Sequence, residues 1–459
     1  MKTYTPELDP AVLDRLRAYA GLFAEDFPQA KPARWAGVYL QGLLLDGERK
    51  SIEPLSRRIA LPEGLTSKDP EQALQQFVNQ SPWDERPVLR RYRSRLAKAF
   101  ASPEGIFVID DTSFPKQGRH SVGVQRQYCG ALGKKANCQV AVSAHYVSPH
   151  GHYPLDLRLY LPDSWLTDAA RLDKAGVPAA ERRPLTKPEI ALELLDRVRG
   201  EGLPGWAVVT DAAYGVSPTF RDGVAARGLV YMAGVTGDHV VFPEQPRWVV
   251  SPAAGRGRPP TRRYLAADNP PPVALQELAQ RVRLRQVTWR EGSKGKLSAR
   301  FAWLRVWPGH DWRHGSCAGA APVWLLIEEQ ADGQLKFAFS NLPPGTSCKR
   351  AVRLWKSRWP VEQGYQQLKE ELGLDHFEGR SWRGFHHHAA LTFLAYGFLA
   401  LERQRAAATR KQPVKKKSAH GADPAGHPAG AATPARATHA RVLPPLPEAP
   451  TDAHTNLTE

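Results

Sequence analysis

The 459-residue sequence has little cysteine and no long apolar run. Its four cysteines, Cys129, Cys138, Cys317 and Cys348, form no C-x-x-C pair, which argues against a zinc ribbon and a disulfide framework. No stretch approaches the roughly 18 unbroken apolar residues of a membrane span, and the most apolar helix-like stretch, 389–401, is too short. The N-terminus carries acidic residues and does not make a signal peptide. We therefore expect a protein of the reducing cytoplasm without a membrane partner.

Acidic residues are also scarce relative to basic ones. There are 46 Asp and Glu against 63 Lys and Arg, which gives a formal net charge of +17. Such an excess favours polyanions, because each neutralised phosphate releases condensed counterions. A need for solubility or a basic proteome would give the same balance. Nucleic acid is nevertheless the favoured partner, and association with the nucleoid is the expected location.

The apolar pattern changes several times along the chain, which has room for two to four domains. An Ala-, Pro-, His- and Thr-rich composition at the C-terminus has too few apolar residues to fold. We predict a helical, DNA-contacting region over 1–100, the first part of a catalytic core over 101–242, a β-rich insertion over 243–345, a C-terminal helical part of the core over 346–404, and a disordered basic tail over 405–459.

The N-terminal region is predicted to be helical and basic, and its last helix spans 84–100. Two interpretations stay open for that helix: a solvated basic face, or a duplex-binding module such as a helix-turn-helix variant. Its basic residues are Arg86, Arg90, Arg91, Arg93, Arg95 and Lys98.

From residue 105 the apolar period changes to that of β-strands. Three strands, a helix and a fourth strand follow one another, which is the order of an RNase H-like mixed α/β core, and a further strand fits the same sheet. These elements are expected at 106–109, 139–147, 153–161, 187–199, 207–209 and 229–234, and insertion strands at 282–289, 297–307, 323–329 and 335–340. A Gly-, Pro- and Arg-rich loop at 254–263 opens the insertion and is either a solvated linker or a phosphate contact.

Two acidic positions follow apolar strands. Asp111 comes after the run 106–109, and Asp211 after the run 206–210. An acid at the end of a buried strand is held rigidly where the sheet meets solvent, which suits a metal ligand. Neighbouring strand residues point to opposite faces, so only one of Asp110 and Asp111 can face such a site, and we favour Asp111. Taken alone, each position is more often a turn or a helix cap.

A third acid, Glu362, lies two helical turns before Lys369, so the two side chains share a helix face. Pro360 fits the first turn of that helix, and Trp355 and Arg358 belong to a preceding turn. The segment is either an ion-paired surface helix or a metal-ligating carboxylate between two phosphate-binding cations.

The segment Trp355-x2-Arg358-x3-Glu362-x6-Lys369 resembles the Y-x2-R-x3-E-x6-K signature of one branch of DDE insertion-sequence transposases. The Asp-Asp-Thr that follows the first strand, and Asp211 after the fourth, are placed as that family's first two acids are. Trp355 departs from the signature because it keeps an aromatic plane but lacks the tyrosine hydroxyl.

The resemblance covers roughly residues 105–400. It implies an RNase H-like fold and a cut-and-paste transposase that uses two Mg²⁺ ions, with Mn²⁺ able to substitute. It also implies double-stranded DNA partners, namely the terminal inverted repeats and the target, and a homodimer in the DNA complex. The residues it implies are Asp111, Asp211 and Glu362 as catalytic metal ligands, with Asp110 as a further candidate, and Arg358, Lys369 and Trp355 as DNA contacts.

Two alternatives remain beside this function. One is an RNase H-like nuclease without strand transfer, and the other is a transposase-derived DNA-binding protein that no longer catalyses. The run 386–388 of three histidines is not expected to bind metal, because consecutive helical side chains diverge by about 100° each. We predict a structural or DNA-facing role for it.

Overall fold

The computed structural model describes residues 10–250, 261–292 and 295–411. Most of the loop predicted at 254–263 and the tail beyond residue 411 lie outside the described residues. The boundary predicted between 404 and 405 falls inside a helix, α14 (Trp382–Lys411). Among the described helices, none combines the length and the apolarity needed to cross a membrane.

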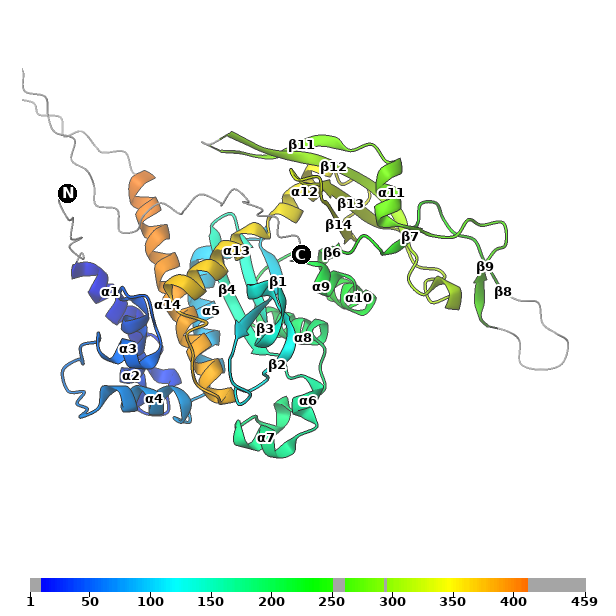
Figure 1. Cartoon of the computed structure of the whole chain (residues 1–459). Coiled ribbons are helices and arrows are strands. Elements are labelled where there is room, and N and C mark those ends of the chain that lie inside the picture. Colours follow the sequence, from blue (N-terminus) through cyan, green and yellow to red (C-terminus); the bar gives the residue numbers. More distant parts are fainter. Residues whose placement is uncertain (1–9, 251–260, 293–294, 412–459) are drawn as a thin grey trace, which may run out of the picture.

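A sheet of five core strands lies at the centre of the molecule, in the order β4-β3-β1-β5-β6 (Figure 1). β1 pairs antiparallel with β3 and parallel with β5, while β6 continues the parallel side. This is the RNase H-like arrangement that the sequence predicts. The core strands are β1 (Ile106–Pro115), β3 (Lys134–Ser148), β4 (Gly151–Leu159), β5 (Ala207–Thr210) and β6 (Val230–Val235), and the short β2 (Gln125–Cys129) pairs with β3.

The insertion extends this sheet, because its last strand pairs antiparallel with β6. Its strands form the upper right part of Figure 1, and a separate two-stranded hairpin, β8–β9, projects from it. The strands are β7 (Val240–Phe242), β8 (Trp248–Val250), β9 (Arg263–Leu265), β10 (Val273–Ala274), β11 (Arg285–Gly292), β12 (Gly295–Pro308), β13 (Val323–Glu329) and β14 (Leu335–Ser340), with the helix α11 (Leu275–Arg281) after β10.

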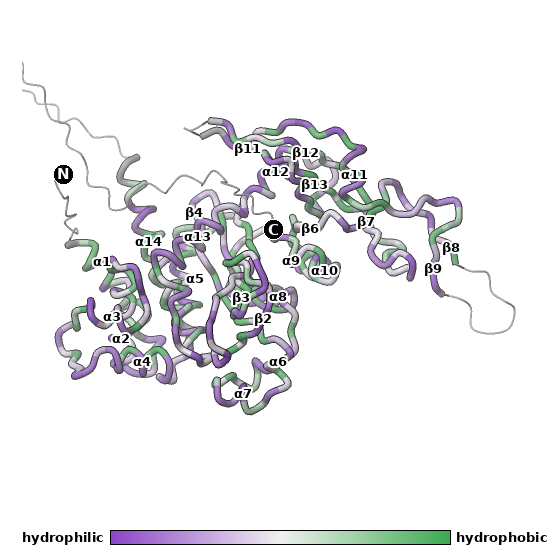
Figure 2. Tube along the Cα trace, in the orientation of Figure 1, coloured by the Kyte–Doolittle hydropathy of each residue, from purple (hydrophilic) through white to green (hydrophobic). Residues whose placement is uncertain are grey.

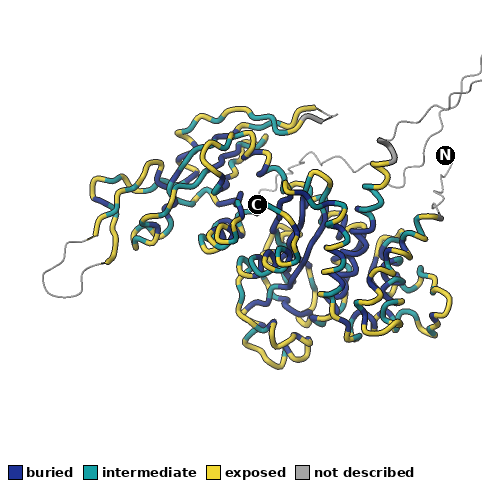
Figure 3. The backbone as a smooth tube through the Cα atoms, turned by 180° about the vertical axis from the view of Figure 1, so that it is seen from behind, coloured by how far each residue is buried: buried dark blue, intermediate teal, exposed yellow. Residues whose placement is uncertain are grey.

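In the described part of the chain, five N-terminal helices pack beside the core. α14 contacts α2, α4 and α5 on one side and β4 on the other, and α5 also contacts β4 directly. Buried residues concentrate along α14 and the core strands (Figure 3). Asp69 and Asp84 cap α4 and α5 by accepting hydrogen bonds from the backbone N–H groups of Gln72 and Arg86. The N-terminal helices are α1 (Pro10–Gly21), α2 (Ala30–Leu44), α3 (Ile52–Ser56), α4 (Pro70–Asn79) and α5 (Glu85–Phe100).

Helices cover both faces of the core sheet. Alternate residues of β1 point to opposite faces, and both sets are buried. Ile109 belongs to the larger apolar cluster, which includes Leu194 of α8, and Val108 belongs to the cluster that includes Val361 of α13. The hydrophobic stretches of the strands are visible in Figure 2. The helices are α6 (Asp163–Leu166), α7 (Ala169–Lys174), α8 (Lys187–Gly200), α9 (Ala212–Gly215), α10 (Pro218–Ala226), α12 (Cys348–Lys356) and α13 (Trp359–Gln366), which continues into the π-helical turn η5 (Gln367–Glu371).

Candidate active site

The first acidic position lies inside a strand. β1 does not end at Ile109 as predicted but runs on to Pro115, because β3 pairs with its whole length. Asp110 and Asp111 therefore point to opposite faces of the sheet. One Asp110 carboxylate oxygen, Oδ2, lies 3.6 Å from Nη1 of Arg358.

Asp111 faces the other side, where its Oδ2 lies 2.5 Å from Nζ of Lys187, the first residue of α8. The geometry therefore does not support the preference for Asp111 as the first acid. Alternation along the strand had shown that only one of the two could face the site. The choice between them required the position of the C-terminal helices, which the sequence alone did not provide.

The other two acids lie where Asp110 points. Asp211 follows β5 and caps α9, accepting a 3.0 Å hydrogen bond from the N–H of Ala213, and its Oδ2 lies 3.6 Å from Nη1 of Arg358. Glu362 is in the first turn of α13, and its Oε1 lies 3.3 Å from Nη2 of the same arginine. Two strands and one helix thus bring three carboxylates around a single guanidinium group.

Burial and mutual repulsion make Asp110 and Asp211 costly to ionise without a cation. The pKa of Asp110 is raised to about 7, chiefly by burial; the positive charge of Arg358 opposes this rise, and the negative charges of Asp211 and Asp111 add to it. Burial also raises the pKa of Asp211, again against the effect of Arg358. The site therefore favours a positive charge at its centre.

The donor set suits a hard divalent cation, because carboxylate oxygens are the ligands such ions prefer. As the side chains stand, no group of three or more His, Cys, Asp or Glu in the described residues is arranged to hold a metal. The guanidinium of Arg358 takes the central place, and its Nη1 is buried without a hydrogen-bond partner. Its positive charge lies between the three acids.

A buried polar network lies directly behind Asp110. The hydroxyl of Ser143, on β3, donates to the backbone carbonyl of Asp110 at 3.3 Å and contacts Nε2 of His145 at 3.0 Å. It also hydrogen-bonds to the hydroxyl of Tyr365, one helical turn after Glu362. This network joins β1, β3 and α13, and no sequence motif indicated it. The spacing of Tyr365 from Glu362 is the one signal that could have suggested it.

Two residues predicted to contact DNA point into the protein. The Nζ of Lys369 donates to the carbonyl of Ser113 at 3.2 Å and lies 5.6 Å from the ring centre of Phe114. The indole N–H of Trp355 donates to the buried Glu328 on β13 at 2.7 Å. Trp355 thus holds α12 against the insertion, and its predicted DNA contact has no support from this arrangement.

The three consecutive histidines of α14 are buried and structural. Burial lowers the pKa of His387 to about 3 and the pKa values of His386 and His388 to about 4, so all three are neutral. Each ring nitrogen that bonds takes a different partner, in keeping with the predicted divergence. The partners are the carbonyl of Trp382 and the backbone N–H of Leu159 for His386, the carbonyls of Val78 and Trp83 for His387, and the hydroxyl of Tyr39 and the carbonyl of Gly373 for His388.

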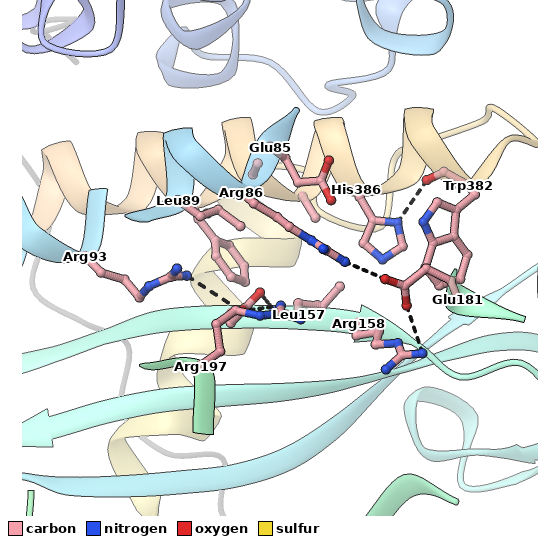
Figure 4. Close-up of a pocket in the computed structure, with 14 residues that line it drawn as sticks. Glu85, Arg86, Leu89, Arg93, Leu157, Arg158, Glu181, Arg197, Trp382 and His386 are labelled. Carbon is pink, nitrogen blue, oxygen red and sulfur yellow. Dashed lines mark hydrogen bonds and ion pairs between the residues drawn. The ribbon is translucent and has the colours of Figure 1, made fainter. Parts of the chain in front are cut away.

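Most of the arginines of α5 are paired with carboxylates inside the protein. Two of them, Arg86 and Arg93, line a charged pocket between α5, β4 and α14, where Glu181 bridges Arg86 and Arg158 (Figure 4). Arg86, Arg90 and Arg93 join α5 to the core, and Arg91 pairs within the N-terminal region, which leaves less charge for the predicted contact with DNA. The pairs are Arg86 with Glu181, Arg90 with Glu201, Arg91 with Glu25 and Asp26, and Arg93 with Asp156 and Glu201.

Comparisons with known proteins find transposases and a family of endonucleases. A probable transposase for insertion sequence element IS701 from Microchaete diplosiphon is 28% identical over 201 residues, which are 44% of this chain and 48% of that protein, so the match spans about half the relative's length. A piggyBac transposase synaptic complex with hairpin DNA aligns with 91% of this chain and 77% of its own, at a TM-score of 0.36 and 9% identity. The family model described as DDE superfamily endonuclease matches residues 22–296, more than half of the chain, and includes Asp110 and Asp211. The chain therefore belongs to the DDE superfamily endonuclease family.

Proposed function

We propose that this chain is a transposase that cleaves the ends of an insertion sequence and transfers their 3′-hydroxyls to target DNA by a cut-and-paste route. The observation that carries the proposal is the convergence of Asp110, Asp211 and Glu362 around Arg358. Membership of the DDE endonuclease family and the name of the IS701 relative support it.

Asp110, Asp211 and Glu362 are the proposed ligands. A divalent cation held by them, Mg²⁺ or its substitute Mn²⁺, would activate the attacking oxygen and stabilise the leaving oxygen, and we propose two such ions. The strands fix Asp110 and Asp211, whereas Glu362 comes from a helix that is anchored to the sheet through Tyr365. These anchored elements keep the three carboxylates close together around Arg358.

Arg358 has two proposed roles. Without a cation it neutralises the three acids, and when a cation binds them its guanidinium is free to hold a DNA phosphate. Bidentate pairing with phosphate oxygens is a geometry for which arginine is suited. Lys369 is proposed to support the strand of the first acid through Ser113, and Asp111 to stay paired with Lys187.

The proposed partners are duplex DNA with the terminal inverted repeats of the element and the target DNA, bound by a homodimer. The net charge of +17 supports a polyanionic partner. Phosphate contacts of this kind position DNA and carry no base readout themselves.

Strand joining tests the proposal. Purified protein is incubated in Mg²⁺ with a pre-cut duplex taken from the DNA that flanks the gene and with a plasmid target, beside Asp211→Asn and Glu362→Gln. We expect wild-type protein to join the end to the plasmid and both variants to lose at least a hundredfold in rate, since each removes a charged ligand. Cleavage without joining would instead support the nuclease, and binding without either reaction the non-catalytic DNA-binding protein.

A further inference from the structure

Helix α12 separates its residues into an apolar face and a basic face. Ala351, Val352 and Leu354 are buried against the sheet, whereas Lys349, Arg350 and Arg353 are exposed. The helix begins after Ser347, whose hydroxyl accepts a hydrogen bond from the N–H of Arg350 at 3.3 Å. We call Lys349, Arg350 and Arg353 the α12 stripe.

The positive charges of the α12 stripe are not compensated within the described part of the chain. No described carboxylate lies within 4.0 Å of any of the three side chains, in contrast to the arginines of α5. Arg353 contacts only the carbonyl of Trp289, at 3.4 Å, and the Arg350 guanidinium lies 5.5 Å from the ring centre of Trp206. These contacts orient the two arginines without neutralising them.

The α12 stripe leads toward the acids. Arg350 lies over Trp206, which precedes β5, whereas Asp211 follows the other end of that strand. The chain then passes through Arg358 into α13 (Figure 1). Trp359, the first residue of α13, is 45% exposed, so an exposed aromatic side chain follows Arg358 in the chain.

We propose that the α12 stripe binds consecutive phosphates of the duplex DNA whose strand enters the acidic site. Side chains three and four residues apart on a helix lie about 5 to 6 Å apart at Cβ, close enough for long basic side chains to contact neighbouring phosphates of one strand. Charge complementarity favours this partner, because each phosphate that a lysine or arginine neutralises releases condensed counterions. The inference rests on the proposed function and adds the path by which the DNA reaches the acids.

The salt dependence of DNA binding tests the inference without any reaction. The affinity of the full chain for a duplex of arbitrary sequence is measured in EDTA at several salt concentrations, because phosphate contacts carry no base readout. The variant combines Lys349→Gln, Arg350→Gln and Arg353→Gln. The control removes the same charge from three exposed lysines elsewhere, on α2, before α4 and on α7: Lys31→Gln, Lys68→Gln and Lys174→Gln.

Each lost phosphate contact lowers the slope of log affinity against log salt by about 0.9. We expect the magnitude of the slope to fall by about 2 to 3 in the stripe variant and by less than about 1 in the control. The thermal unfolding of both variants should be unchanged. Equal slopes for the two variants would overturn the stripe while leaving the proposed function in place. Failure of the wild-type chain to bind DNA at all would overturn both.

Discussion

At the residue scale, the hydroxyl of Tyr365 is expected to contribute more to stability than the buried hydroxyl of Tyr153, because it has a hydrogen-bond partner. Removing it in Tyr365→Phe leaves Ser143 short of a partner, which is expected to lower the free energy of unfolding by about 1 kcal/mol and to slow strand joining. Tyr153→Phe is the matched control, because the buried Tyr153 hydroxyl has no hydrogen-bond partner. Chemical denaturation of both variants measures the difference, and equal losses would contradict the assigned role.

Asp110 is expected to make the stability of the cation-free protein depend on pH. Burial raises its pKa from 3.8 to about 7, so folding favours the protonated form. The corresponding stability is fully present below pH 3.8 and is lost as the pH rises through 7. Asp110→Asn, which is neutral at every pH, should remove this part of the decline.

Thermal unfolding of Asp110→Asn in EDTA between about pH 4 and 8 tests that prediction, with wild-type protein and Asp111→Asn as comparisons. We expect Asp110→Asn to gain melting temperature over wild type at the alkaline end and little at the acidic end. A wild-type curve parallel to that of Asp110→Asn would show that the Asp110 carboxyl does not titrate in this range.

At the element scale, Glu328 of β13 joins the insertion to α12. Its carboxylate is only 3% exposed, accepts the indole N–H of Trp355 and pairs with Lys356. Glu328→Gln leaves the ammonium of Lys356 without its partner, which is expected to cost about 3 kcal/mol of folding free energy. Its neighbour Glu329, paired with Arg300 at a more exposed position, provides the control Glu329→Gln at less than about 1 kcal/mol. Denaturant titration compares the two, and similar costs would contradict a joining role for Glu328.

The apolar pattern predicted most elements of the core but not their full extent. The period of two placed the strands, and the period of 3.6 placed α8, because both patterns follow directly from which face is buried. The pattern ended β1 at Ile109, since Asp110 and Asp111 are polar. The pairing of β1 with β3 carries it on to Pro115, and such a tertiary contact is not written in the local sequence.

Only part of the candidate site could be predicted, because the rest also depends on tertiary contacts that the local sequence does not specify. The positions of Asp211 and Glu362 followed from a strand end and a spaced signature, and both lie at Arg358. Trp355 was predicted to contact DNA from its place in the signature, whereas in the structure its N–H is bonded to Glu328, 27 residues away in the sequence. Whether such a side chain is available to DNA depends on its partner in the folded protein. A partner so distant in the sequence cannot be inferred from the spacing of a motif.

At the scale of the whole molecule, one sheet links the insertion to the core, and α14 links the core to the N-terminal helices. The three acids therefore stand on elements that a single framework holds together. That framework places Asp110 with the other acids and Asp111 on the opposite face, beside Lys187. The identity of the first acid is the point at which the structure and the sequence pattern differ most.

Strand joining by Asp110→Asn and Asp111→Asn, side by side in Mg²⁺ with wild-type protein, tests this account most directly. Asp110→Asn should lower the rate of strand joining by at least about a hundredfold, because it removes a proposed ligand. Asp111→Asn should keep the rate within about tenfold of wild type. Loss of joining in Asp111→Asn with retention in Asp110→Asn would contradict the assignment of the site.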